Sequence, residues 1–166
     1  MRQASIRVLA GTLVCTAAFG FTAWAFGTAK GTLNYKAKKG EVTVNVTHAN
    51  FVRVPSIGNG KPMRRLILST ADTTAALKAC QNRMCSDGEI GEGMTVDFDA
   101  GERLHYWFVA NDQLIQYSGT AVLSSAKLTT DTPTRIAGTL DIDDTAAGGA
   151  KVKVEFDASL VKEIVK

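Results

Sequence analysis

Two cysteines five positions apart, Cys80 and Cys85, are the residues whose chemistry can best be judged from the sequence. Such a pair can bind a metal, exchange disulfides or form a structural disulfide. A zinc site needs four ligands, commonly with a second Cys or His pair, and the only two histidines of the chain are isolated from each other. A thioredoxin-like redox centre has two residues between its cysteines and a βαβ setting. We therefore predict a structural disulfide, with metal binding and redox chemistry as alternatives.

The two histidines, His48 and His105, are the next candidates for chemistry. His48 continues the alternation of the apolar residues in 42–46, so we expect it to point inward as a hydrogen-bonded core or rim residue. His105 stands in an aromatic segment and could form one edge of an exposed aromatic surface. The alternative is that His105 and Trp107 face away from the apolar residues that alternate with them. No Gly-x-Ser-x-Gly elbow accompanies the serines. The sequence therefore predicts no catalytic residue, and His48, His105 and Trp107 are candidate binding residues.

Two groups of acidic residues could in principle bind calcium, which takes six to eight oxygen ligands. The first contains Asp97 and Asp99, and the second contains Asp141, Asp143 and Asp144. Neither group has the spacing of an EF-hand loop. The acids also alternate with apolar residues, as solvent-facing strand positions do. We predict a solvated face and no bound cofactor, with the second group as the better of two weak metal candidates.

The first thirty residues predict the compartment. Arg2 and Arg7 make the start basic, the segment 8–29 carries no charge, and small residues flank the Ala23-Trp24-Ala25 site. This pattern is typical of an export signal. We therefore predict a helical signal peptide over residues 1–25 and one domain over residues 26–166, in the periplasm or outside the cell. The alternative is an uncleaved membrane anchor. Oxidising compartments favour disulfides, and cleavage would remove Cys15 and leave an even number of cysteines.

The charge balance excludes one class of function. The chain has 19 Lys and Arg; without Arg2 and Arg7, 17 remain against 16 Asp and Glu. A nucleic-acid-binding protein needs a clustered excess of basic residues, so we predict no nucleic-acid partner. Apart from an uncleaved signal, we expect no membrane contact. The neighbouring Arg64 and Arg65 are expected on an edge or a solvent-facing stretch.

Short alternating segments separated by Gly, Pro and Asp predict β-strands. One or two helical turns are expected within 70–80, because Thr70 or Asp72 can cap them. Strands at this spacing predict an all-β protein. We expect an antiparallel β-sandwich, Ig-like or jelly-roll-like, with one short helix; a partly closed barrel is the alternative. The predicted strands are 32–37, 42–55, 64–70, 94–100, 103–110, 113–119, 119–125, 135–143 and 150–158.

Two terminal stretches carry a family resemblance. "GTLNYKAKKGEVTVNVTHA" and "RIAGTLDIDDTAAGGAKVKVEFDASL" resemble the ends of small exported bacterial β-proteins of unassigned function. The resemblance implies a fold and a compartment, and it assigns no functional residue. The lack of a catalytic constellation, together with hairpins that expose strand edges for pairing, predicts an exported, non-enzymatic domain that binds another envelope or secreted protein. The alternatives are a carrier of a small ligand or metal ion, and a hydrolase with an unrecognised site.

Overall fold

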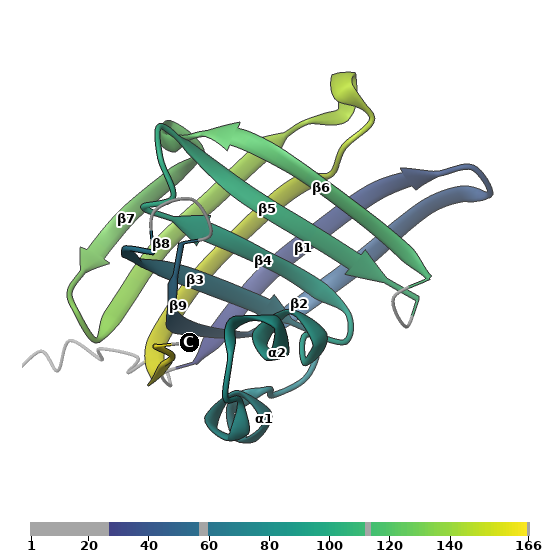
Figure 1. The fold of residues 1–166 in the computed structure, drawn as a ribbon. Helices are drawn as coiled ribbons and strands as arrows, with labels where there is room; N and C mark the ends of the chain where they lie inside the picture. The colour runs from purple at the N-terminus through teal and green to yellow at the C-terminus, as the bar shows by residue number, and fades with distance from the viewer. Residues whose placement is uncertain (1–26, 57–59, 112–113, 166) are drawn as a thin grey trace, which may run out of the picture.

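A computed structural model describes residues 27–56, 60–111 and 114–165. The predicted signal peptide lies outside this range. Nine strands of the described chain form one sheet, in the order β6-β5-β4-β3-β2-β1-β9-β8-β7 (Figure 1). The all-β prediction is confirmed. The elements are β1 (Thr28–Ala37), β2 (Gly40–Pro55), β3 (Pro62–Ser69), α1 (Thr74–Ala79), α2 (Arg83–Gly88), β4 (Gly93–Phe98), β5 (Arg103–Ala110), β6 (Ile115–Val122), η1 (Leu123–Ser125), β7 (Ala126–Asp131), β8 (Arg135–Asp143), η2 (Thr145–Ala147) and β9 (Lys151–Glu163).

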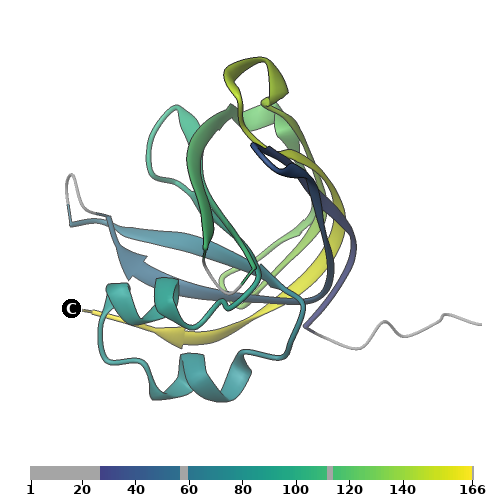
Figure 2. The same ribbon diagram turned by 90° about the vertical axis from the view of Figure 1, so that its right-hand side faces the viewer.

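The expected β-sandwich is wrong, because the strands form one strongly curled sheet, a half-barrel (Figure 2). The first six strands and the last three join where β1 pairs antiparallel with both β2 and β9. Gly31 of β1 and Gly138 of β8, which both pair with β9, have φ angles of +152° and +156°. Glycines of this kind let a sheet bend sharply. A sandwich and a half-barrel share the same alternation of apolar and polar residues, so the alternation could not distinguish them.

The concave face of the half-barrel holds the main core. Leu33, Phe51, Leu66, Phe108 and Leu140 are fully buried there. They come from β1, β2, β3, β5 and β8, so the core joins both parts of the sheet. Burying each side chain of this size contributes about 1.5–3 kcal/mol.

Two of the predicted strands are in fact one. Residues 115–122 form β6 without interruption, although Gly119 was expected to separate two strands. Strand β7, Ala126–Asp131, was not predicted and follows β6 after the short η1 turn. Because these consecutive strands lie at opposite ends of the sheet order, η1 carries the chain from one edge of the half-barrel to the other.

The two helices lie on the convex face of the sheet (Figures 1 and 2). A second apolar cluster joins them to the sheet. It contains Val52, Val54, Ile67 and Val109 of the sheet, with Leu77 of α1. One helix was expected, and α2 is the unpredicted second. It has six residues, too few to show a helical period, and the Asn82 side chain caps it by accepting the Cys85 N–H at 3.1 Å. Neither helix is long or apolar enough to span a bilayer, and the described residues hold no other α-helix.

The predicted disulfide between Cys80 and Cys85 is confirmed. Cys80 is the C-cap residue of α1, and Cys85 lies within α2 rather than in a loop, so the bond ties the two helices together. On the other side, Lys162 of β9 donates a hydrogen bond to the Lys78 carbonyl at 2.9 Å, next to the end of α1. The disulfide and Lys162 therefore hold the helix pair against the sheet.

Replacing both cysteines with serine is expected to lower the free energy of unfolding by about 2 kcal/mol, the chain entropy lost on closing so short a loop. Urea denaturation of the two proteins measures the difference. A reducing agent should lower the midpoint of the wild type and leave the Cys80→Ser/Cys85→Ser variant unchanged. Two alkylatable thiols in the unreduced wild type would contradict the assignment.

Candidate functional site

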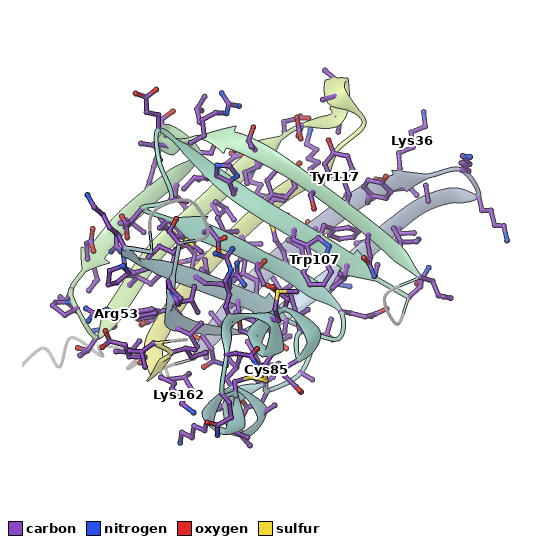
Figure 3. The ribbon with its side chains drawn as sticks, viewed as in Figure 1. Lys36, Arg53, Cys85, Trp107, Tyr117 and Lys162 are labelled. Atoms are coloured by element: carbon purple, nitrogen blue, oxygen red, sulfur yellow. A yellow bond between two sulfur atoms is a disulfide. The ribbon has the colours of Figure 1, made fainter. Side chains whose placement is uncertain are left out.

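An open groove of about 640 Å³ lies on the convex face, between α2 and strands β4, β5 and β6. We call it the helix groove. Trp107 of β5 and Cys85 of α2, both labelled in Figure 3, pack against one apolar cluster where helix and sheet meet. The lining residues are Ser56, Met63, Arg65, Arg83, Met84, Asp87, Thr95, Asp97, Ala100, His105, Tyr106, Trp107, Ser118 and Gly119.

Part of the wall of the helix groove is apolar. Trp107 is half-buried and packs against the second apolar cluster, which also includes Met63. Met84 projects from α2 and is 72% exposed. Ala100 belongs to the turn after β4 and is partly buried against the same cluster. An aromatic ring and an exposed, flexible thioether therefore border a space that is open to solvent.

The floor of the helix groove is a buried cluster of two arginines and two aspartates. Arg65, 3% exposed, binds Asp97 through two parallel hydrogen bonds of 2.6 and 2.9 Å. It also pairs with Asp87 and donates to the Ser86 hydroxyl at 3.3 Å. Arg83 reaches Asp97 at 3.2 Å and the Pro55 carbonyl at 3.0 Å. The charges of the cluster balance, so the floor is neutral and its side chains are fixed in place.

Burial and mutual interaction shift the pKa values of this cluster. Burial raises the pKa of Asp87, against the opposing effect of Arg65. Burial and the positive charge of Arg65 lower the pKa of Arg83. Burial alone would lower the pKa of Arg65, but Asp97 and Asp87 outweigh it and raise that pKa. For Asp87 and Arg83, the interactions with neighbouring charges therefore do not offset the cost of burying the charge. Both residues line the groove.

The sequence placed two members of this cluster wrongly. Arg65 was expected on an edge or facing solvent, yet β3 is an interior strand and Arg65 is buried. Asp97 was expected on a solvated face, yet it is 7% exposed. Both side chains point to the convex face, as the alternation predicts for Asp97. They are buried because α2 covers that face, and α2 was not predicted.

Two of the three candidate binding residues meet in the helix groove. Trp107 and His105 both lie on the convex side of β5, while Leu104, Tyr106 and Phe108 fill the core. His48 lies elsewhere, in a groove beside α1 and β9, with its Nδ1 2.9 Å from the Thr47 hydroxyl. It does not join the core, because β2 changes phase between Val46 and Ala49, next to a bulge in β1.

The acidic metal candidates do not converge. Asp141 and Asp143 are exposed on the convex side of β8, and Asp143 pairs with Lys151 at 2.9 Å. The Thr145 hydroxyl and Lys151 lower the pKa of Asp143 to about 2. Asp144 points the other way and accepts hydrogen bonds from Tyr106 and Tyr117. Among the described residues, no group of three or more His, Cys, Asp or Glu is arranged to hold a metal ion.

The contact of Asp144 with the two tyrosines was not foreseen from the sequence. Gly119 and Gly149 make room for it, because a Cβ at either position would lie within 2.8 Å of the Asp144 carboxylate. Burial, with the hydrogen bond and the charge of Asp144, raises the pKa of Tyr106 well above its ordinary value. The only signal in the sequence was the pair of glycines, one in a strand and one in the loop before β9.

The Tyr106 contact predicts a loss of stability in alkali. A phenol whose pKa is raised by folding contributes stability below the unfolded pKa of about 10. This contribution is lost as the pH rises through the folded pKa. We expect the urea midpoint of the wild type to fall above about pH 10, and Tyr106→Phe to show a shallower fall. Urea denaturation across this range tests the prediction, and equal slopes for the two proteins would contradict it.

No protein-family model, curated protein or solved structure matches this chain. The function is therefore inferred from the geometry of the helix groove.

Proposed function

We propose that the protein is an exported, non-catalytic binding domain and that the helix groove is its binding site. The observation that carries the proposal is a half-buried tryptophan beside an exposed methionine, above a charged floor that is already paired. Binding sites are typically concave and largely apolar, with a few polar groups that fix orientation. The volume of about 640 Å³ lies in their usual range.

The hydrogen bonds of Asp97 favour binding over catalysis. His105 lies directly opposite Asp97 in the register of β4 and β5. A carboxylate beside a histidine could orient it as a base. However, one oxygen of Asp97 accepts a hydrogen bond from Arg65, and the other accepts from both Arg65 and Arg83. Both oxygens of the carboxylate therefore bind the two arginines of the floor, and Asp97 does not orient His105 as a base.

The composition of the groove favours a protein partner. Trp, Met and Arg are enriched at the centres of protein interfaces, and Trp107, Met84 and Arg83 stand together here. We infer that an aromatic or apolar side chain of an envelope or secreted protein inserts between Trp107 and Met84. The Cys80–Cys85 disulfide supports the exported setting, since such bonds persist in oxidising compartments.

Tryptophan fluorescence provides a direct test. Trp24 and Trp107 are the two tryptophans of the chain, so Trp107 is the only one left after cleavage of the predicted signal. The exported protein, immobilised, is exposed to envelope extract from its own host, and each retained protein is then purified and titrated into it. A partner that enters the groove should shift the emission of Trp107 to shorter wavelength, because the ring loses contact with water.

Variants then separate the groove from the rest of the surface. Trp107→Ala should weaken the partner at least about tenfold, as expected for a central aromatic anchor. Lys127→Ala, on strand β7 and outside the groove lining, should leave the affinity unchanged. Equal binding by the wild type and Trp107→Ala would refute the groove as the site. A small molecule retained in native mass spectrometry of the wild type but lost in Trp107→Ala would instead indicate a ligand carrier.

A further inference from the structure

Strand β6 is an edge strand without the features that usually protect one. It pairs with β5 over eight residues without a register shift. Its sequence, IQYSGTAV, contains no charged residue and no proline. The edge strand β7 differs, because it carries Lys127 and Asp131 and has a register shift between Leu128 and Thr130. Charges and bulges on edge strands prevent pairing with other chains. Strand β7 is protected against such pairing, whereas β6 is not.

Exposed apolar side chains lie at both ends of β6. Leu114, immediately before the strand, is 87% exposed. Val122, its last residue, is 52% exposed, and Leu123, which follows it, is 50% exposed. In the described part of the chain, the other large apolar residues exposed to this degree are Met84 and Val165. Leu114 at one end and Val122 with Leu123 at the other therefore flank the edge of β6, where a paired strand would cover them.

We propose that two copies of this protein pair through β6, antiparallel, about a two-fold axis at Ser118. In an antiparallel pair, residues directly opposite each other point to the same face of the sheet. With Ser118 opposite the partner's Ser118, Leu114 lies opposite the partner's Val122, and Val122 opposite the partner's Leu114. Leu114 of each copy thus covers Val122 of the other copy, and the two-fold symmetry makes this contact twice.

In the same register, the side chains on the other face of β6 also fit together. Ile115 lies opposite the partner's Ala121, and Tyr117 opposite the partner's Gly119, so large residues meet small ones. No two like charges meet, since β6 has none. Main-chain hydrogen bonds along the shared edge supply affinity. The interface uses the same patch on both copies, which is the usual form of a symmetric dimer. This self-complementarity favours a second copy over an unrelated strand.

Sedimentation equilibrium of the purified, exported protein tests the proposal. The wild type should have twice the monomer mass. Ser118→Lys places two lysines opposite each other at the axis and should weaken the dimer at least about tenfold. The substitution suits the fold because Ser118 is exposed on the convex face. Thr139→Lys is the matched control, since Thr139 is exposed on the interior strand β8, and it should remain dimeric.

Mixing provides a second measurement that is independent of folding defects. Ser118→Lys and Ser118→Glu should each be monomeric alone and should form a mixed dimer when combined, because opposite charges then face each other. A monomeric wild type, or a Ser118→Lys protein that dimerises like Thr139→Lys, would overturn the proposal. Because the mass alone is measured, this result is independent of whether a partner binds at Trp107.

Discussion

Replacing Arg65 with methionine should lower the free energy of unfolding by about 3–5 kcal/mol, the usual cost of removing one partner of a buried ion pair. Arg65 makes two hydrogen bonds to Asp97 and pairs with Asp87. Methionine fills much of the space, but it leaves Asp97 with Arg83 alone and removes the ion pair that Asp87 makes with Arg65. Urea denaturation of Arg65→Met and the wild type, with the slope of the transition compared, measures the loss.

The neighbouring arginine is the natural control. Arg64 also makes two hydrogen bonds to one carboxylate, that of Asp99, and pairs with Asp131. Its partners are about half exposed, at 46% for Asp99 and 54% for Asp131. Ion pairs in solvent contribute about 1 kcal/mol or less, so Arg64→Met should have a small effect. Equal losses in the two variants would show that burial beneath α2 does not determine the cost.

Replacing Gly31 with alanine should cost at least about 3 kcal/mol, combining backbone strain with overpacking. Gly31 has a φ of +152°, and a Cβ there would lie 2.1 Å from the Lys153 carbonyl oxygen of β9. The obstacle is backbone, so no side-chain rotation can relieve it. The expected result is a lower thermal midpoint and loss of protection from hydrogen exchange where β1 pairs with β9.

Substitution of Gly40 separates the cost of backbone strain from the cost of overpacking. Gly40 also has a positive φ, +135°, but no atom lies within 4 Å of a Cβ built there. Gly40→Ala should therefore cost only the backbone strain, about 1 kcal/mol. If Gly31→Ala were no worse than Gly40→Ala, the close approach of β9 would not be the reason for glycine at position 31.

Local alternation was sufficient to predict most strands but not their assembly. The apolar residues of 42–46 were expected to alternate towards the inside, and Val44 and Val46 do lie in the main core. The half-barrel depends instead on β1 pairing with β9, and on the close approach of β9 to Gly31 and of β7 to Gly138. These are contacts between distant segments, and a single sequence carries no local pattern for them.

The candidate site was predicted only in part, for a related reason. His105 and Trp107 were singled out, and they do lie on the same wall of the helix groove. Arg65 and Asp97 were expected in solvent, because their environment depends on α2. That helix has six residues and is held by the Asn82 cap and the disulfide. Where a short element covers a polar face, composition cannot show that the face is buried.

The position of β9 in the sheet bears on how the chain folds. Strands β1 to β6 follow one another as neighbours, so they can pair as soon as each is synthesised. Strand β9 pairs with β1, at registers such as Leu33 with Val152, more than a hundred residues apart in the chain. Contacts between such distant segments form slowly. The edge of β1 that pairs with β9 therefore stays unpaired until residues beyond 151 have been synthesised. Folding intermediates should associate with other chains through that edge.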